Sequence, residues 1–384
     1  MRYKGVLSVI APYLVRRGAS KNIVRTMSSS GKYQVYNVFI HIILFLFDKC
    51  KVMFGIHNNS SYVIKNTTII LCSIPVYIPL KIILCQCDLK VWEQASPCPR
   101  QELLKHVAGA NGIYCSLTDK IDKELLDAAG SGLKVVATIS VGHDHIDVQE
   151  CKKRGIRIGY TPDVLTDATA ELTLALLLST SRRLPEAQNE ARTGGWVSWA
   201  PTWMTGPGLA GATVGIVGFG RIGQAVARRV KSFNTAKIIY FNRSVRPEAE
   251  EVGAVKVTFD ELLTQSDFVI CCCALVPETK EIFNKTAFEK MKRTAIFVNT
   301  SRGGTVDQDA LIEALQNNTI RAAGLDVTTP EPLPLDSPLF KLKNCIVLPH
   351  IGSASIEARN TMSELTAQNI LAALNDTKMP AELK

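Results

Sequence analysis

Acidic residues are nearly absent from the beginning of this 384-residue chain. Residues 1–87 contain 11 Lys and Arg but a single acid, Asp48, whereas the rest contains 33 Lys and Arg and 34 Asp and Glu. The formal charge of +9 therefore belongs to the beginning alone, and the remainder does not have the basic surface of a nucleic-acid-binding protein. Residues 1–36 have the acid-free, Arg- and Ser-rich composition of a mitochondrial presequence, and Met27 is an equally good internal start for a cytoplasmic form.

Residues 37–84 lack Ala and Glu, and 11 of these 48 residues are Ile. The apolar run at 38–47 is shorter than the about 20 residues that cross a bilayer. The run at 67–84 is interrupted by Pro75, Pro79 and Lys81, so we do not expect a membrane segment. Because this atypical apolar insertion interrupts a fold that resumes near residue 87, we interpret it as foreign to the native coding sequence.

Zinc-type cysteine spacing is also missing, although the chain contains 11 cysteines. Cys271, Cys272 and Cys273 belong to an apolar, strand-like run, 268–275, in which small thiols are expected to be buried. This usage indicates a reducing compartment and no metal centre. The length and the 46% of apolar residues predict two domains with substantial cores.

Strand and helix signals alternate from residue 87 onward. The first group predicts a small α/β domain over residues 85–164, with strands at 89–92, 112–115 and 134–140 and helices at 100–107 and 120–130. We expect the last helix, 355–374, to fold back on this domain, so that 355–384 belongs to it.

A second domain is predicted over residues 165–354. It begins with a helix at 168–181, which we expect Asp167 to cap and which is apolar all round, so it is buried under a sheet or in a subunit interface. The later alternation predicts a doubly wound parallel sheet, with further strands at 237–241, 295–299, 322–327 and 345–348.

The centre of this second domain is a glycine-rich turn. Residues 213–223 are interpreted as an apolar strand that leads into Gly218-x-Gly220-x-x-Gly223, and 224–231 as a helix. Gly218 would make the tight turn, Gly220 would let backbone N–H groups approach a phosphate, and Gly223 would pack helix on strand. The helix N-terminus adds partial positive charge. Strand, helix and second strand form one βαβ unit, which predicts a dinucleotide site rather than an incidental turn.

The segment after the second strand, 240–246, lacks the Asp or Glu that binds the ribose 2′-hydroxyl in NAD enzymes. It contains Arg243, Ser244 and Arg246 instead, and guanidinium groups bind a 2′-phosphate through charge-assisted hydrogen bonds. We therefore predict NADPH as the cofactor, with NADH as a weaker one. The alternative is that both arginines are ordinary surface residues.

Candidate acids and bases lie where predicted strands end, because ligands of open α/β sheets bind at that edge. Three of the six histidines qualify: His143, His145 and His350. An imidazole at His350 could protonate a carbonyl oxygen as a hydride arrives. Arg302, on a glycine-flanked turn, is suited to a substrate carboxylate, and Glu331 is suited to holding His350 protonated.

These strand ends and the glycine motif resemble the D-2-hydroxyacid dehydrogenase family. The resemblance covers residues 87–384 and includes ordered motifs at 108–112, Ser140-Val-Gly-His-Asp-His145, 154–163 and Gly194-Gly-Trp-Val-Ser-Trp199. It implies a Rossmann-type NADP-binding domain and a smaller flavodoxin-like substrate domain, within the branch that reduces glyoxylate and hydroxypyruvate.

The resemblance implies that Arg302, Glu331 and His350 form a catalytic trio. Arg302 would orient a 2-keto acid, and the Glu331–His350 pair would deliver the proton. Further implied substrate contacts are the backbone N–H groups of Val141 and Gly142, Ser353, and Trp199 as an aromatic cap across a homodimer interface or as simple interface packing. The implied cofactor contacts, besides residues 243, 244 and 246, are Gly218, Gly220, Arg221, Ile222, Gly223, Ala274, Thr300, Asp326 and Gly352.

The implied activity is the NADPH-dependent reduction of glyoxylate and hydroxypyruvate to glycolate and D-glycerate. Two alternatives stay open: a dehydrogenase for another D-2-hydroxy acid and, from a different class, a dinucleotide-sensing transcriptional corepressor. The chain departs from the family at its front, where members have a strand, a loop and a helix. We expect residues 32–36 to supply that strand and residues 37–84 to replace the rest, which would expose apolar sheet.

Overall fold

A computed structural model describes residues 68–71, 87–92, 94 and 96–384. No helix in this described part is long and apolar enough to cross a membrane. Residues 1–36 and most of the block 37–84 lie outside it. Their interpretation as a presequence and as foreign sequence therefore stays a prediction.

The larger sheet contains seven parallel strands in the order β12-β11-β10-β9-β6-β7-β8. This is the Rossmann order with one added strand, so the fold class predicted from the sequence is confirmed. The order reverses between β6 and β9, where such sheets bind ligands beyond the carboxyl ends of their strands. The strands are β6 (Thr213–Val217), β7 (Lys237–Phe241), β8 (Val255–Lys256), β9 (Phe268–Cys271), β10 (Ile296–Asn299), β11 (Ala322–Leu325) and β12 (Cys345–Val347).

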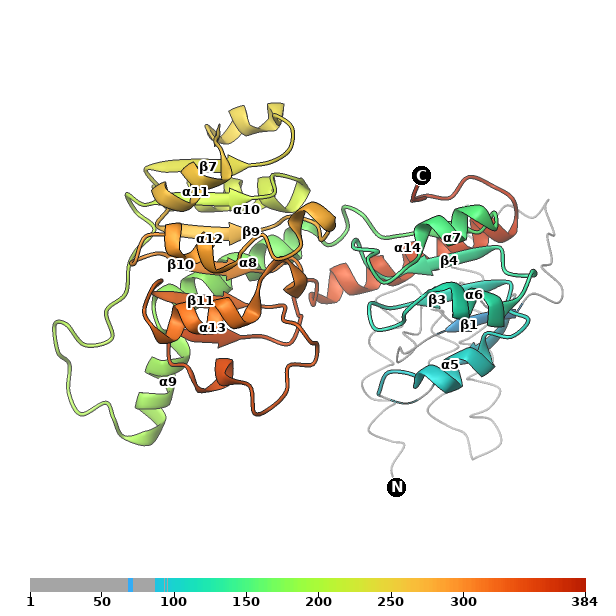
Figure 1. The fold of residues 1–384 in the computed structure, drawn as a ribbon, viewed down its shortest axis with the longest axis horizontal. Helices are drawn as coiled ribbons and strands as arrows, with labels where there is room; N and C mark the ends of the chain where they lie inside the picture. The colour runs from blue at the N-terminus through green and yellow to red at the C-terminus, as the bar shows by residue number, and fades with distance from the viewer. Residues whose placement is uncertain (1–67, 72–86, 93, 95) are drawn as a thin grey trace, which may run out of the picture. The chain divides into compact units, whose positions relative to one another are not determined.

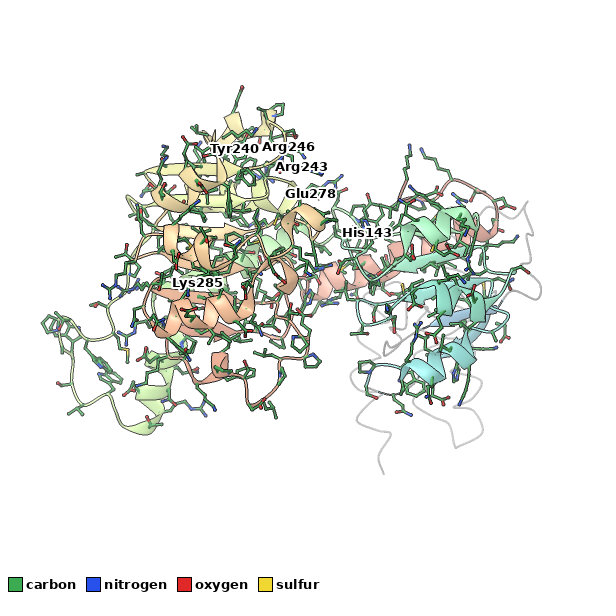
Figure 2. The ribbon with its side chains drawn as sticks, viewed as in Figure 1. His143, Tyr240, Arg243, Arg246, Glu278 and Lys285 are labelled. Carbon is green, nitrogen blue, oxygen red and sulfur yellow. The ribbon has the colours of Figure 1, made fainter. Side chains whose placement is uncertain are left out.

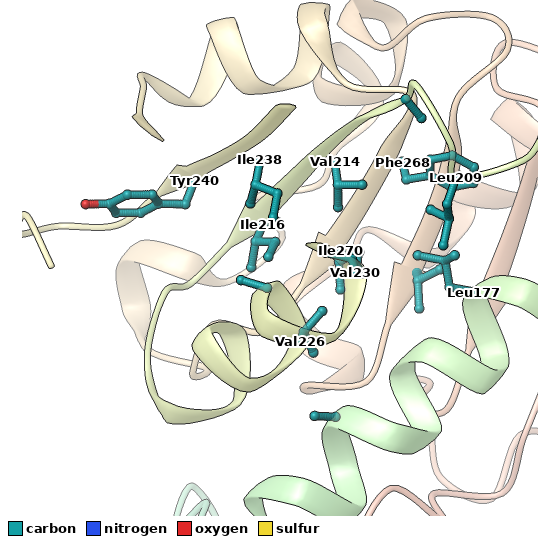
Figure 3. Packing of buried hydrophobic residues seen from close by; sticks show 14 of the residues in the cluster. Leu177, Leu209, Val214, Ile216, Val226, Val230, Ile238, Tyr240, Phe268 and Ile270 are labelled. Carbon is teal, nitrogen blue, oxygen red and sulfur yellow. The ribbon is translucent and has the colours of Figure 1, made fainter. Parts of the chain in front are cut away.

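Helices cover both faces of this sheet (Figure 1). On one face, apolar side chains of the strands pack with Leu177 of α8 and with Val226 and Val230 of α10, as Figure 3 shows. The other face is covered by α11, α12 and α13, whose first turns are capped by Thr258, Asn284 and Asp307. Their bounds are α8 (Thr166–Ser181), α10 (Arg221–Lys231), α11 (Phe259–Gln265), α12 (Lys285–Lys290) and α13 (Gln308–Gln316), and the short 3₁₀ helices are η1 (Pro247–Val252), η2 (Pro277–Thr279), η3 (Gly303–Thr305) and η4 (Pro338–Lys341).

The helix α8 ends at Ser181, as predicted, but its start and its N-cap residue differ from the prediction. Leu165, not Asp167, is its N-cap residue, and Asp167 lies in the first turn, where an acid interacts favourably with the helix dipole. Beyond its end, Arg183 adopts a left-handed conformation and starts α9 (Leu184–Thr193), a helix that we did not predict. Pro185 is compatible with that helix because it occupies the first turn, where no N–H partner is needed.

The smaller sheet has five parallel strands in the flavodoxin-type order β2-β1-β3-β4-β5. One face packs against α14, through residues such as Ile370 and Ala367, and the other against α5 and α6, through Leu103 and Leu125. The elements are β1 (Thr68–Leu71), β2 (Asp88–Val91), β3 (Gly112–Cys115), β4 (Val135–Thr138), β5 (Arg157–Gly159), α5 (Arg100–His106), α6 (Lys123–Ala129), α7 (Val148–Lys153) and α14 (Ile356–Leu374).

The strand β1, between β2 and β3 in the smaller sheet, corrects one expectation. We expected residues 32–36 in this position, but Thr68–Leu71 occupies it and pairs with both β2 and β3. Ile69 is fully buried there. A parallel strand with both faces covered needs consecutive β-branched or aliphatic residues, which the Ile-rich block contains.

Candidate active site

The glycine-rich turn after β6 has the shape that a dinucleotide pyrophosphate requires. Gly218 has φ +91°, and a Cβ there would lie 2.5 Å from the Cα of Cys273. A Cβ on Gly223 would lie 2.2 Å from the carbonyl oxygen of Gly218, whereas no atom lies within 4 Å of one on Gly220. A side chain is therefore excluded at Gly218 and Gly223. The space beside Gly220 is open, so a phosphate could approach the backbone there.

The helix α10 begins at Arg221 without a side-chain cap on its first N–H groups. Uncapped N–H groups at a helix N-terminus are suited to a phosphate. Arg221 is exposed and forms an ion pair with Asp163, and Ile222 packs on the apolar cluster under the helix. The described residues thus fit the pyrophosphate of a dinucleotide.

The residues predicted to select the cofactor follow β7, as Figure 2 shows for Arg243 and Arg246. The hydroxyl of Tyr240 accepts a hydrogen bond of 3.1 Å from the backbone N–H of Arg246. Arg243 and Ser244 are exposed, while Nε of Arg246 is buried and has no hydrogen-bond partner among the described residues. No carboxylate in the described part of the chain forms an ion pair with Arg243 or Arg246, and free guanidinium groups suit an anionic group of the cofactor.

His350 and Glu331 form a direct pair. Nδ1 of His350 lies 2.7 Å from Oε2 of Glu331, and Oε1 of Glu331 accepts a hydrogen bond of 3.1 Å from the backbone N–H of Thr328. Burial alone would raise the pKa of Glu331, but the hydrogen bond and charge of His350, with the charge of Arg302, lower it. The carboxylate therefore stays ionised beside the imidazole, and Nε2 is the ring atom left for a substrate.

Asp326 anchors the loop that carries His350. Its carbonyl oxygen accepts the backbone N–H of His350 at 2.9 Å, and its carboxylate accepts those of Ile351 at 2.8 Å and Gly352 at 2.7 Å. These bonds hold His350 in a left-handed conformation with φ 54°. Burial raises the pKa of Asp326 despite the backbone donors. Asp326 was predicted as a cofactor contact, and in the structure it fixes the position of His350, the predicted proton donor.

Arg302 lies where β10 ends and reaches the loop after β4. Its guanidinium donates to the carbonyl oxygen of Ser301 at 2.9 Å and to Oδ1 of Asp144 at 3.0 Å. A Cβ on Gly142 would lie 1.8 Å from Nη2 of Arg302, so the guanidinium packs directly on that glycine. The structure therefore brings together Arg302 and the predicted carboxylate-binding residues of the 141–142 turn.

Sequence reasoning missed Asp144 as a partner of Arg302. The available signal was an acid between two histidines directly after a strand. Burial would raise the pKa of Asp144, but the charge of Arg302 and its hydrogen bond lower it. The pair holds the guanidinium against the loop after β4.

The other predicted site residues are spread over the same strand ends. Thr300 is buried, with Oγ1 2.7 Å from Oγ1 of Thr173, whereas Ala274 is exposed after β9. Ser353 and Val141 are half-buried. Trp199 is 80% exposed in the loop after α9, so nothing in the described part of the chain packs over it. No cluster of metal-ligating side chains occurs among the described residues.

The buried surroundings of His145 indicate a structural role for this residue and not a role in proton transfer. Its Nε2 lies 3.0 Å from Oγ1 of Thr138, and its Nδ1 is buried with no partner among the described residues. Burial, opposed by Asp144 and assisted by the charges of Arg302 and His143, lowers the pKa of His145 to about 4. The imidazole is therefore neutral near pH 7.

We expect His145 to make folding sensitive to acid. The folded state binds fewer protons at a histidine whose pKa is lowered, so the free energy of unfolding falls as the pH falls from about 6.5 to about 4. The loss from this group is ~3 kcal/mol. Urea unfolding at pH 7.0, 5.5 and 4.5 should show a shallower pH dependence for His145→Gln than for the unmodified protein. His106→Gln, on α5, is the control, and equal slopes for all three proteins would contradict the assignment.

A dinucleotide cradle on the same sheet edge as an imidazole–carboxylate pair is typical of nicotinamide-dependent oxidoreductases of the doubly wound α/β class. Residues 174–352 match the family model described as the NAD binding domain of D-isomer specific 2-hydroxyacid dehydrogenase. The chain is 56% identical over 299 residues to the glyoxylate reductase/hydroxypyruvate reductase of Homo sapiens. This alignment covers 78% of this chain and 91% of the human protein.

Solved structures agree. An NADPH-dependent glyoxylate/hydroxypyruvate reductase from Sinorhizobium meliloti, in complex with NADP and malonate, has a TM-score of 0.70 and 32% identity, and the match covers 83% of this chain and 97% of that one. A D-lactate dehydrogenase from Aquifex aeolicus, complexed with NAD and lactic acid, has a TM-score of 0.72 and 29% identity over 81% and 96%. The chain belongs to the D-isomer specific 2-hydroxyacid dehydrogenase family, which confirms the resemblance seen in its sequence.

Proposed function

We propose that this protein reduces glyoxylate and hydroxypyruvate to glycolate and D-glycerate with NADPH. The observation that carries the proposal is the contact of 2.7 Å between His350 and Glu331 on the sheet edge where Arg302 packs on Gly142. Reduction of a 2-keto acid requires a cation that binds its carboxylate, here Arg302, and an acid that protonates its carbonyl oxygen, here His350. The names of the relatives support the choice of substrates.

A nicotinamide dinucleotide held at the glycine-rich turn after β6 would supply a hydride for the keto carbon of the substrate. Arg302 binds the substrate carboxylate together with the backbone N–H groups of Val141 and Gly142, which fixes the direction in which the carbonyl points. His350 donates the proton from Nε2 to the carbonyl oxygen. Glu331 keeps the ring oriented through Nδ1 and stabilises its protonated form, because a carboxylate beside an imidazole favours the cation.

We propose further that the active form is a homodimer and that Trp199 covers the substrate site of the partner subunit. The support is the exposure of three tryptophans in one loop: 62% for Trp196, 80% for Trp199 and 39% for Trp203. Aromatic side chains exposed together are typical of interface residues. Trp199 would exclude water from the keto acid.

The proposal for NADPH rests on Arg243 and Arg246. Both guanidinium groups lie after β7 without a carboxylate in the segment 240–246, and a carboxylate there would repel a 2′-phosphate. Charge-assisted hydrogen bonds are each worth about 1.5–3 kcal/mol, less where the groups are exposed. The arginines therefore favour NADPH over NADH.

Steady-state oxidation of NADPH and NADH with glyoxylate, hydroxypyruvate and pyruvate tests both parts of the proposal. We expect turnover of the first two keto acids with NADPH, and an increase of ~10–100-fold in the KM for NADPH in Arg243→Ala/Arg246→Ala, with little change for NADH. Arg228→Ala, an exposed arginine of α10, is the control. Faster turnover of pyruvate than of glyoxylate and hydroxypyruvate would contradict the proposed substrates. An equal rise in KM for NADPH and NADH in the double variant would contradict the proposed role of the two arginines.

A further inference from the structure

Two thiols lie together at the carboxyl end of β9. The Sγ atoms of Cys271 and Cys273 are 3.6 Å apart. Both side chains pack on the face of the sheet that α11, α12 and α13 cover, whereas Cys272 packs on the opposite face with α8 and α10. Alternate residues of a strand point to the same side, so Cys271 and Cys273 form a pair from which Cys272 is excluded.

The pair is placed at the dinucleotide site. β9 lies beside β6 at the point where the strand order reverses, and Cys271 is in register with Val217, directly before the glycine-rich turn. A Cβ on Gly218 would lie 2.5 Å from the Cα and the backbone nitrogen of Cys273. The backbone of Cys273 therefore forms one wall of the turn that holds the pyrophosphate.

The two sulfurs differ in exposure and in hydrogen bonding. Cys271 is fully buried, with Sγ 3.1 Å from Oγ of Ser301 and 3.6 Å from Oγ1 of Thr305, while Cys273 is partly exposed. Burial alone would raise the pKa of Cys271, but its hydrogen bond with Cys273 and its contacts with Ser301 and Thr305 lower that pKa below its usual range. Once the pair has lost one proton, the two sulfurs share the other.

We propose that Cys271 and Cys273 are a modification site at which a hydroperoxide forms a reversible intrachain disulfide that weakens dinucleotide binding. A disulfide needs a sulfur–sulfur distance of about 2.05 Å, so the two atoms must approach by about 1.5 Å. Side-chain rotation together with a small shift of the chain after β9 supplies this movement. No third cysteine is required.

The reaction is a two-electron oxidation. When the proton shared by the pair lies on Cys271, the accessible sulfur of Cys273 attacks one oxygen of the peroxide as a thiolate, the O–O bond breaks, and the leaving hydroxide takes up a proton from solvent to become water. The sulfur of Cys271 then attacks the resulting sulfenic acid, an S–S bond forms, the S–O bond breaks, and a second water leaves with the proton of Cys271. Both sulfurs are oxidised, the peroxide is reduced, and a dithiol such as dithiothreitol reverses the change.

The disulfide acts on the cofactor site through the backbone. Drawing Cys273 toward Cys271 moves the wall that packs on Gly218, where no side-chain atom can be added without a clash. It also removes the contacts of the Cys271 sulfur with the hydroxyls of Ser301 and Thr305, and Oγ1 of Thr305 donates to the carbonyl oxygen of Arg302 at 2.7 Å. Because coupling is reciprocal, bound NADPH should in turn oppose disulfide formation.

Peroxide treatment followed by N-ethylmaleimide labelling and peptide mapping tests the chemistry. All three cysteines lie in the tryptic peptide 257–280. We expect three labels on this peptide in the reduced protein and one label, on Cys272, with the loss of two hydrogens after oxidation. Fluorescence titration should show at least a tenfold higher Kd for NADPH in the oxidised protein, reversed by dithiothreitol. This readout does not depend on which keto acid is turned over.

Cys273→Ser is the variant that removes the partly exposed partner, and Cys272→Ser is the matched control on the opposite face. Each is compared with its own reduced form, so any change in basal affinity cancels. Peroxide should leave the Kd of Cys273→Ser unchanged and raise that of Cys272→Ser as in the unmodified protein. Three N-ethylmaleimide labels on peptide 257–280 after oxidation would overturn the proposal, as would a disulfide that includes Cys272. A Cys271–Cys273 disulfide that leaves the Kd for NADPH unchanged would also overturn it.

Discussion

Replacing His350 by Gln is expected to lower kcat by about 10²–10⁴-fold while the Kd for NADPH stays nearly the same. The amide of Gln occupies a similar volume and can still bond to Glu331, but it has no proton to transfer at neutral pH. The loop itself is held by Asp326 through backbone N–H groups, which the substitution does not alter. Stopped-flow or steady-state NADPH oxidation with hydroxypyruvate measures kcat, and fluorescence titration measures the Kd.

His106→Gln is the control for this experiment because it makes the same change on α5, where the ring lies by the carbonyl oxygen of Glu102 and edge-on to Trp92. It should retain the activity of the unmodified protein. Turnover preserved in His350→Gln would show that another group delivers the proton. An equal loss of kcat and of NADPH affinity would mean that the loop had collapsed, and the assignment would then fail.

Replacing Arg302 by Lys is expected to lower kcat/KM for glyoxylate by about 10²–10⁴-fold. A lysine keeps the charge beside Asp144, so the cost of an unpaired carboxylate is avoided, but it cannot form the two parallel hydrogen bonds of a guanidinium with a carboxylate. Two charge-assisted hydrogen bonds are worth about 3–6 kcal/mol together, which sets this range. We expect a higher KM and a lower kcat, because the carboxylate also fixes the direction of the carbonyl.

Arg293→Lys is the matched control, since Arg293 precedes β10 at its amino end and Arg302 follows the same strand at its carboxyl end. Its Nε donates to the carbonyl oxygen of Asn318 at 3.3 Å, away from the proposed substrate site. It should leave kcat/KM unchanged. A loss in Arg293→Lys as large as in Arg302→Lys would indicate a general effect on the fold, and no loss in Arg302→Lys would remove it from substrate binding.

Features that depend on short stretches of chain could be predicted from the sequence. The glycine positions follow from local geometry, because Gly218 has φ +91° and a Cβ on Gly223 would clash with the carbonyl oxygen of Gly218 in the same βαβ unit. The parallel strands are continuous apolar runs, so their order of appearance indicates the fold class. Helix boundaries were less predictable, because the start of α8 is set by how the preceding loop leaves the sheet and not by the nearest capping residue.

Contacts between distant segments could not be predicted. Asp144 and Arg302 are separated by 158 positions, and neither the acid nor the arginine carries a signal of the other. The same holds for His145, whose position after a strand suggested chemistry until its burial beside Thr138 was known. The strand at Thr68–Leu71 was missed because composition alone marked the surrounding block as foreign.

The sequence by itself determined that this protein binds a dinucleotide in a doubly wound α/β domain and that His350, Arg302 and Glu331 follow strand ends. These properties are local, since a turn or a strand end is formed by neighbours in the chain. Only the tertiary structure decided that Asp144 holds Arg302 and that Cys271 and Cys273 share one face beside Gly218. Distances between side chains depend on strand order and on which face each residue occupies, and both are set by packing of the whole chain.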